Sequence, residues 1–226
     1  MPKIGILALQ GASALHAEAV TFLGAHPVEV RRPEDLAGVD AVILPGGEST
    51  TLARLLASSG LDEVLAEGLA DGLPAFGTCA GMILLASQIL DGRPGQGPED
   101  NYLRIPRGKV PGRWLTECEG SYLSDPQRCF GAIDVAVRRN AFGSQVDSFE
   151  AAVAVDGLVG GDFPATFIRA PVVERVGDGV EVVATVAAPD GSRRPVLCRQ
   201  GPVLVAAFHP ELSDDLRLHQ SFLSSL

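Results

Sequence analysis

The stretch Gly77-Thr78-Cys79-Ala80-Gly81 decides the fold, because it places a cysteine between small residues where two unlike segments meet. A short apolar segment ending near Phe76 predicts a strand, and the apolar run that continues to Leu90 predicts a buried helix. A nucleophile elbow has this form, since the residues two before and two after the nucleophile must be small for the chain to double back. The pattern makes Cys79 a candidate nucleophile.

The position of Cys79 also favours its reactive form. A sulfur at a helix N-terminus lies near unpaired amide donors and the positive end of the helix dipole, which stabilise a thiolate. The alternative is a small buried cysteine, which is a common role for a free thiol. The glycines on both sides and the change from strand to helix favour the nucleophile.

Outward from this stretch, short apolar runs alternate with helical segments through the first half of the chain. The predicted strands are 4–9, 28–31, 41–44 and 75–76, and the predicted helices are 14–23, 50–57, 61–70 and 80–90. This order predicts an α/β fold with parallel strands and crossover helices. The runs 41–44 and 203–208 are apolar at every position, so the sheet is expected to be mostly parallel with helices on both faces.

The second half is richer in strands. They are predicted at 133–137, 151–155, 165–168, 180–186, 195–198 and 203–208, before a last helix that Ser213 would cap. Between Leu90 and Gly131, glycine and proline recur around the single tryptophan, Trp114, which predicts an irregular excursion. We therefore expect one domain over 1–226, with an insertion at about 91–129.

Composition narrows the choice of partners. The formal charge of -10 and the lack of any long Lys/Arg cluster argue against nucleic acid. No apolar run reaches the roughly 18 residues needed to cross a bilayer, so no membrane association is expected. Cys79, Cys118, Cys129 and Cys198 are too scattered for a disulfide scaffold or a zinc site, which predicts a reducing cytoplasm and no metal.

A candidate base for the cysteine occurs at His209-Pro210-Glu211, directly after the apolar run 203–208. In an extended segment, residues two apart point to the same side, so His209 and Glu211 are expected to project together. Glu211 would then fix the imidazole tautomer that can take the proton of Cys79. Taken alone, His209 would be a strand-end histidine in a turn, and the other histidines, His16, His26 and His219, are expected at the surface or in packing.

A third element is Pro45-Gly46-Gly47-Glu48-Ser49-Thr50, between a buried strand and a helix. Acyl transfer needs donors aimed at the developing oxyanion, and amides of Gly47 and Ala80 are candidates for such a hole. The alternative is a tight turn in which Ser49 caps the helix.

Together these motifs resemble one family, the glutaminase subunits of pyridoxal 5'-phosphate synthase, which are class I glutamine amidotransferases. The similarity extends over nearly the whole chain and rests on 9–11, 45–51, 77–81, 139–140, 142–143, 145–150, 167–171 and 209–212. It implies a flavodoxin-like three-layer fold. The departure is at 91–129, where the family usually has a shorter connection.

The resemblance implies that Cys79 attacks the side-chain amide of L-glutamine, that His209 and Glu211 assist, and that water releases L-glutamate from a thioester. Ammonia would pass to the synthase subunit, a separate barrel protein, so pyridoxal 5'-phosphate is the complex's product and no cofactor of this chain. The segment Gln10-Gly11 would move to complete the oxyanion hole, although Gly11 is equally well explained as a turn after the first strand.

The residues implied to surround glutamine are Gly47, Glu48, Ser49, Arg139, Ile168 and Arg169. The planar guanidinium of Arg139 suits the α-carboxylate of an amino acid, whereas without the resemblance it would be a solvated strand-end charge.

Two alternatives stand beside this interpretation. One is another class I amidotransferase, such as that of histidine biosynthesis, with the same three residues and a different acceptor. The other is a redox-sensing flavodoxin-like protein that oxidises Cys79 and would have no need of His209 and Glu211.

Overall fold

The computed structural model describes residues 1–90, 129–139, 148–188 and 191–226. At its centre lies a seven-stranded sheet with the order β10-β11-β12-β4-β3-β1-β2. The strands from β12 to β2 in this order are parallel, and β11 and β10 extend one edge in antiparallel pairing. The strands of the parallel part are β1 (Lys3–Leu7), β2 (His26–Val30), β3 (Ala41–Leu44), β4 (Ala75–Thr78) and β12 (Val203–Ala206).

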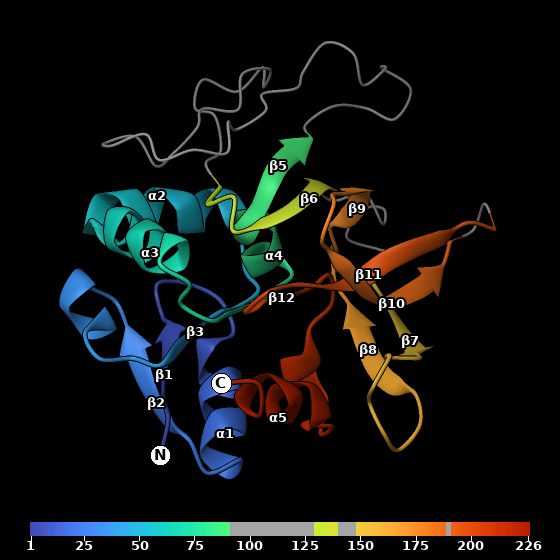
Figure 1. The fold of residues 1–226 in the computed structure, drawn as a ribbon, viewed down its shortest axis with the longest axis horizontal. Helices are drawn as coiled ribbons and strands as arrows, with labels where there is room; N and C mark the ends of the chain where they lie inside the picture. Colours follow the sequence, from blue (N-terminus) through green and yellow to red (C-terminus); the bar gives the residue numbers. More distant parts are fainter. Residues whose placement is uncertain (91–128, 140–147, 189–190) are drawn as a thin grey trace.

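Helices cover both faces of this sheet, as the sequence predicts. In Figure 1, α1 (Ser13–Phe22) and α5 (Arg217–Leu223) lie on one side. On the other side lie α2 (Ser49–Ser59), α3 (Leu61–Ala70) and α4 (Ala80–Leu85). A short 3-10 helix, η1 (Pro33–Leu36), follows β2. The predicted three-layer α/β fold is confirmed.

Two smaller sheets stand beside the central one. The first joins β5 (Ala86–Leu90), β6 (Ile133–Arg138) and β9 (Val172–Val176), and the second pairs β7 (Phe149–Val153) with β8 (Phe163–Phe167). The antiparallel strands β10 (Glu181–Ala187) and β11 (Arg193–Gln200) complete the chain's strand-rich half. The strand β9 was not predicted, because Val172–Val176 contains a central Glu-Arg pair that interrupts its apolar pattern.

The helix predicted over 80–90 is wrong in its second half. The helix α4 ends at Leu85, and Ala86 turns to extended backbone with a ψ of 157°, after which β5 pairs with β6. An apolar run without polar interruption does not distinguish a buried helix from a buried strand. The partner strand β6 lies more than forty residues away in the sequence, so its pairing leaves no local signal.

The predicted start of the last helix is also wrong. The segment after β12 first forms a 3-10 helix, η3 (Pro210–Leu212), and α5 begins only at Arg217. The hydroxyl of Ser213 accepts a hydrogen bond from the amide of Asp215 at 3.0 Å, which stabilises a turn before the helix. Ser213 therefore acts in the connection and does not cap α5.

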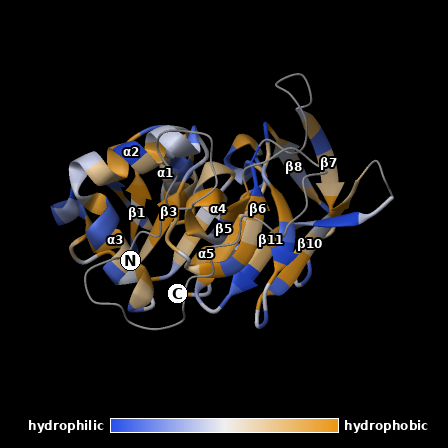
Figure 2. Ribbon diagram, turned by 90° about the horizontal axis from the view of Figure 1, so that it is seen from above, coloured by the Kyte–Doolittle hydropathy of each residue, from blue (hydrophilic) through white to orange (hydrophobic). Residues whose placement is uncertain are grey.

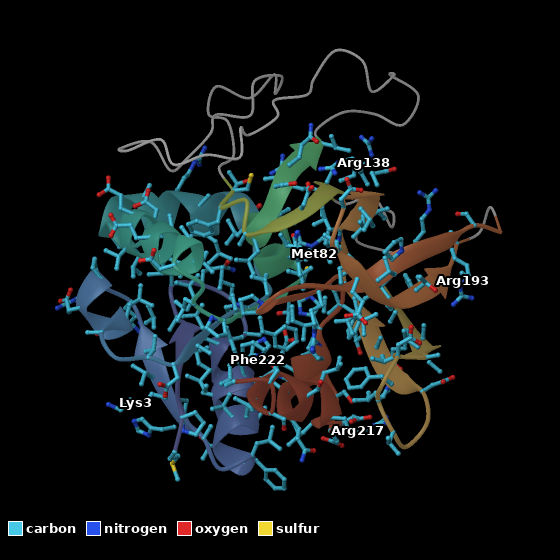
Figure 3. All side chains as sticks on the ribbon, viewed as in Figure 1. Lys3, Met82, Arg138, Arg193, Arg217 and Phe222 are labelled. Carbon is cyan, nitrogen blue, oxygen red and sulfur yellow. The ribbon has the colours of Figure 1, made fainter. Side chains whose placement is uncertain are left out.

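The core lies between the sheet and its helices. The strands β3, β4 and β12 are buried at every residue, as expected for a sheet covered on both faces. Figure 2 shows the central strands as the most hydrophobic part, and Figure 3 shows Met82 and Phe222 inside the molecule. Each fully buried side chain of this size contributes about 1.5–3 kcal/mol relative to exposure.

Some predictions lie outside the described residues. They concern the predicted insertion at about 91–129. Only its last residue, Cys129, belongs to the described residues, and it is buried. In the part of the chain that is described, no helix has the length and apolar character needed to span a bilayer. No group of three or more His, Cys, Asp or Glu side chains there is arranged to hold a metal ion.

Candidate active site

The register of two central strands sets up the site. In the pairing of β4 with β12, Thr78 lies opposite Ala206, and both strands end at these residues. The amide of Cys79 then donates a hydrogen bond to the carbonyl of Ala206 at 2.8 Å. The residues that follow the two strands therefore leave the same edge of the sheet side by side.

Cys79 occupies a strained turn, as the elbow pattern predicts. Its φ of 48° and ψ of -102° lie outside the regions that side chains with a Cβ prefer, and α4 begins at the next residue. Such a conformation costs about 1–3 kcal/mol and persists only where the surrounding structure imposes it. The cysteine is buried apart from 6% of its surface.

The two glycines of the elbow are required by close backbone contacts. A Cβ on Gly81 would lie 1.9 Å from the carbonyl oxygen of Leu44, and one on Gly77 would lie 2.7 Å from backbone atoms of Gly81. No real Cβ approaches backbone so closely, so any larger residue would push α4 away from β3. The small residues on both sides of Cys79 in the sequence are therefore required by packing of the backbone.

His209 and Glu211 meet at the same edge of the sheet, but on a turn and not on the predicted extended segment. β12 ends at Ala206, and Pro210 opens the 3-10 helix that brings the Glu211 carboxylate back toward His209. The imidazole Nδ1 and Glu211 Oε1 are 2.7 Å apart. The amide of His209 donates to the carbonyl of Thr166 at 2.9 Å, which anchors the turn on β8.

Charge interactions link the three residues. Burial opposes protonation of His209, but a hydrogen bond with Cys79, a second with Glu211 and the charges of both raise its pKa to about 10. Burial likewise opposes ionisation of Glu211, yet the hydrogen bond with His209 and the proximity of His16 lower the pKa of this carboxyl below its usual range. The contacts with Cys79 and Glu211 therefore favour the protonated form of His209.

The loop after β8 closes over the cysteine. The Sγ of Cys79 lies 3.8 Å from the carbonyl oxygen of Ile168, whose side chain is partly exposed. Arg169, the next residue, has a φ of 45°, which is unusual for a residue with a side chain. The structure thus brings Ile168, one of the predicted glutamine-binding residues, into contact with Cys79, and Arg169 follows it in the chain.

The glycine turn after β3 faces the imidazole. A Cβ on Gly46 would lie 2.3 Å from Cε1 of His209, so this position must lack a side chain for the ring to fit. The turn is also tied to the predicted gate segment. Gln10 Oε1 accepts from the amide of Glu48 at 2.9 Å, and Gly11, at a φ of 101°, packs against the carbonyl of Gly46.

The helix cap in this turn differs from the predicted one. Glu48 is the N-cap of α2, and its carboxylate accepts hydrogen bonds from the amides of Thr50 and Thr51 at 3.3 and 2.7 Å. Burial opposes its charge, but these bonds lower the pKa of Glu48 below its usual range. Ser49 is the first residue of the helix and buried, so the alternative in which Ser49 caps it is wrong.

Arg139 reaches this turn from the end of β6. Its Nη1 donates to Oγ1 of Thr50 at 3.0 Å. The guanidinium therefore lies beside the first turn of α2, next to Glu48 and Ser49, and is not the solvated strand-end charge that the sequence left open.

Sequence reasoning missed two histidines. His16 on α1 and His219 on α5 are both buried and polar-bonded, with Nδ1 of His16 2.9 Å from Nε2 of His219. The other nitrogen of His16 lies 3.4 Å from Oε2 of Glu211. They are separated by 203 positions, so no spacing in the sequence could have joined them. The exposed His26 is at the surface as expected.

A cysteine elbow on a mostly parallel sheet, with a His–Glu pair at the adjoining strand end, is the arrangement of a class I glutamine amidotransferase. The chain belongs to the SNO glutamine amidotransferase family, whose model matches residues 6–96 and 121–226. The family expected from the motifs is thereby confirmed, and the alternatives from histidine biosynthesis and redox sensing are set aside.

Relatives and solved structures agree with this assignment. The chain is 48% identical to "Pyridoxal 5'-phosphate synthase subunit PdxT" of Parafrankia sp. (strain EAN1pec), over 98% of this chain and 92% of that one. It is 48% identical to the protein of the same name from Frankia casuarinae, over 100% and 95%. A crystal structure described as a glutamine amidotransferase superposes with a TM-score of 0.76 at 41% identity, covering 98% of this chain and 97% of that one.

Proposed function

We propose that this chain is the glutaminase subunit of a pyridoxal 5'-phosphate synthase. It hydrolyses L-glutamine to L-glutamate and ammonia and passes the ammonia to the synthase subunit for vitamin B6 biosynthesis. Family membership and relatives that carry the name of this subunit support the proposal. The structural observation that carries it is the line of contacts from Cys79 through His209 to Glu211.

In the proposed first step, Sγ of Cys79 attacks the carbonyl carbon of the glutamine side-chain amide. The C–S bond forms as the carbonyl electron pair moves to oxygen, where amides of Gly47 and Ala80 would stabilise the oxyanion. His209, held as an imidazolium, gives its proton to the leaving nitrogen. The C–N bond breaks, ammonia leaves, and a thioester remains on Cys79.

In the second step, water replaces the lost ammonia. Neutral His209 takes a proton from the attacking water, the C–O bond forms, and the C–S bond breaks to release L-glutamate. The proton on His209 restores its imidazolium beside the thiolate of Cys79. Glu211 stabilises that charge throughout and keeps the ring oriented through Nδ1.

Binding of glutamine would use charges on both sides of the α2 N-terminus. The guanidinium of Arg139 suits the α-carboxylate, and the ionised Glu48 suits the α-ammonium group. Gly47, Ser49, Ile168 and Arg169 would surround the remainder of the substrate. The contact of Ile168 with Cys79 supports a binding mode in which the side chain of glutamine extends from Arg139 toward the thiol.

A gate is proposed at Gln10-Gly11, where docking of the synthase subunit would change the backbone. The support is direct contact: Gln10 holds the amide of Glu48, and Gly11 packs on Gly46, so movement of one segment must move the other. A change at an oxyanion donor acts on the transition state. Docking is therefore expected to raise kcat more than it changes KM, and an equal kcat with and without the partner would contradict the gate.

The test of the proposed function is glutamate release from L-glutamine, measured with and without a synthase subunit from the same source. Glutamate formation that depends on Cys79 is expected. No hydrolysis in either condition would refute the proposal. We also propose a cytoplasmic location, since Cys79 and Cys198 are free thiols.

A further inference from the structure

The second oxygen of the Glu211 carboxylate faces a buried pair of histidines. Oε1 is bonded to His209, while Oε2 lies 3.4 Å from Nε2 of His16. His16 in turn lies 2.9 Å from His219 through its other nitrogen, and Oγ1 of Thr78 is 3.3 Å from Nε2. A chain of polar contacts therefore continues beyond the three candidate catalytic residues and ends in the layer between β4, α1 and α5.

The pair is enclosed by aromatic rings. The ring centroid of Phe76 lies 6.5 Å from that of His16 and 5.8 Å from that of His219, and the ring of Phe222 packs against Phe76 at an angle of 39°. Both histidines are essentially inaccessible, with 0% and 1% of their surfaces exposed. Burial of this kind favours the neutral imidazole, because it removes water from the charged form, and for His16 this effect outweighs the opposing charge of Glu211.

The electrostatic surroundings agree with neutral rings. Burial lowers the pKa of His16 to about 4, against the opposing effect of Glu211 and with a smaller contribution from His209. Burial lowers the pKa of His219 to about 3; repulsion from His16, when that ring is protonated, adds to the effect, and Glu211 opposes it. Within the described residues, Glu211, His209 and the histidines themselves are the titratable groups that act on the pair.

A neutral imidazole donates from one nitrogen and accepts at the other, which fixes the direction of the chain. The carboxylate of Glu211 presents only lone pairs to Nε2 of His16 at 3.4 Å, so electrostatic attraction favours the tautomer with the proton on Nε2. Nδ1 of His16 then accepts from Nε2–H of His219. Nδ1 of His219 is left without a proton and, among the described residues, without a hydrogen-bond partner. The N–H of His219 therefore points to His16, and the N–H of His16 points to Glu211.

We propose that His16 and His219 are positioning residues of the glutaminase: His219 orients His16 through their hydrogen bond, and the N–H of His16 that faces Oε2 stabilises Glu211 as an oriented carboxylate for His209. This role rests on the proposed function. Oε2 of Glu211 is buried and makes no hydrogen bond among the described residues, so the N–H of His16 that faces it at 3.4 Å is the polar group that stabilises its charge. His219 fixes the tautomer of His16, because an unprotonated Nε2 would face the carboxylate lone pairs.

Loss of the donor has a defined consequence for the chemistry. Glu211 would take up a proton more readily, and a neutral carboxyl no longer stabilises the His209 imidazolium. Formation of the thiolate–imidazolium pair would then require a higher pH. A purely structural role for the histidines would lower stability without moving this pH dependence.

The experiment compares His16→Phe, which removes the N–H that faces Oε2, with His16→Gln, whose side-chain amide can still present an N–H to this oxygen. Phe222→Leu is the matched control, because it loosens the same aromatic cluster without removing a polar group. The readouts are kcat and KM for glutamine with the synthase present, and the pH dependence of iodoacetamide alkylation at Cys79, followed by mass spectrometry of its peptide.

For His16→Phe we expect kcat to fall about tenfold with little change in KM, and the acid limb of alkylation to move up by about one pH unit. His16→Gln should stay within about twofold of wild type, and Phe222→Leu should keep the wild-type limb. A limb and a kcat in His16→Phe that match Phe222→Leu would overturn the inference.

Two further outcomes keep the inference separate from the proposed function. If wild type releases no glutamate, the proposed function fails, while the alkylation profiles still decide on the histidine pair. If His16→Phe does not fold, ¹⁵N NMR of the wild-type histidines decides instead. A proton on Nε2 of both rings supports the proposal, and a proton on Nδ1 of His16 overturns it.

Discussion

The front and back of the candidate active site are specified in different ways. The elbow in front is contained in 77–81, where the strained Cys79 and the two glycines that its turn requires are consecutive in the sequence. The layer behind Glu211 joins His16 and His219 from opposite ends of the chain. A local motif is therefore visible in the sequence, whereas a polar layer assembled by α1 and α5 packing is visible only in the fold.

The largest effect is expected at the front. In Gly81→Ala the new Cβ would meet the backbone carbonyl of Leu44, which cannot rotate away, so a loss of more than about 4 kcal/mol is expected. Little folded protein should remain, as measured by urea unfolding. The control is Gly68→Ala in α3, where the nearest atom belongs to the flexible side chain of Leu73 and the change should stay within about 1 kcal/mol. Equal stability of the two variants would contradict the packing account.

The back of the site should dominate the response to acid. The pKa of His16 is lowered from 6.5 to about 4, so the unfolded chain binds its proton first and stability falls as the pH drops through this window. At roughly 1.4 kcal/mol per unit, the decline from this residue between pH 7 and 4.5 is about 2–3 kcal/mol. His16→Gln should lose that part of the decline in urea unfolding, while His26→Gln, at an exposed residue, should retain it. The same decline in both variants would argue against a buried neutral His16.

At the junction of the two regions, Glu211→Gln should fold but work slowly. The amide can still hold the imidazole of His209, but it no longer stabilises the imidazolium, so kcat is expected to fall about a hundredfold or more. Steady-state glutamate release measures this. A rate equal to wild type would make Glu211 a bystander in the chemistry.

The smallest effect is expected for Arg139→Lys, at the residue that contacts the first turn of α2. Lysine keeps the charge but loses the planar fork, so KM for glutamine should rise about tenfold with kcat little changed. Arg138→Lys is the matched control, because the guanidinium of Arg138 donates to Glu174, whereas that of Arg139 donates to Thr50. An unchanged KM in Arg139→Lys would remove Arg139 from the glutamine site.

The same contrast explains what could be predicted from the sequence. The strand over Ala41–Leu44 and the helix over Leu61–Ala70 match prediction, because apolar runs and periodicity mark them clearly. The break between α4 and β5 at Ala86 does not, because pairing with β6 overrides a continuous apolar pattern. The prediction that Ser213 caps the last helix is wrong, because a serine before acidic residues is typical of a turn as well as of a helix cap.

The site divides along the same line. Cys79, His209 and Glu211 were named because glycine spacing and the order of strand and turn are local signals. The contacts of Arg139 with Thr50 and of Cys79 with Ile168 needed tertiary packing to appear, although the family resemblance pointed to the residues. The histidine pair has neither a local motif nor a family resemblance to mark it. Each histidine lies alone on its helix, so the sequence indicates only a packing role for it.

The most direct test of the account follows nitrogen from glutamine labelled with ¹⁵N in its side-chain amide. Wild type with the synthase subunit should release glutamate and deliver ¹⁵N into pyridoxal 5'-phosphate. Cys79→Ala should fold normally, release less than a few per cent of the wild-type glutamate and deliver no label, while added ammonium salt restores product formation. Glutamate release by Cys79→Ala at a rate near that of wild type would contradict the central claim that Cys79 is the nucleophile of a glutaminase.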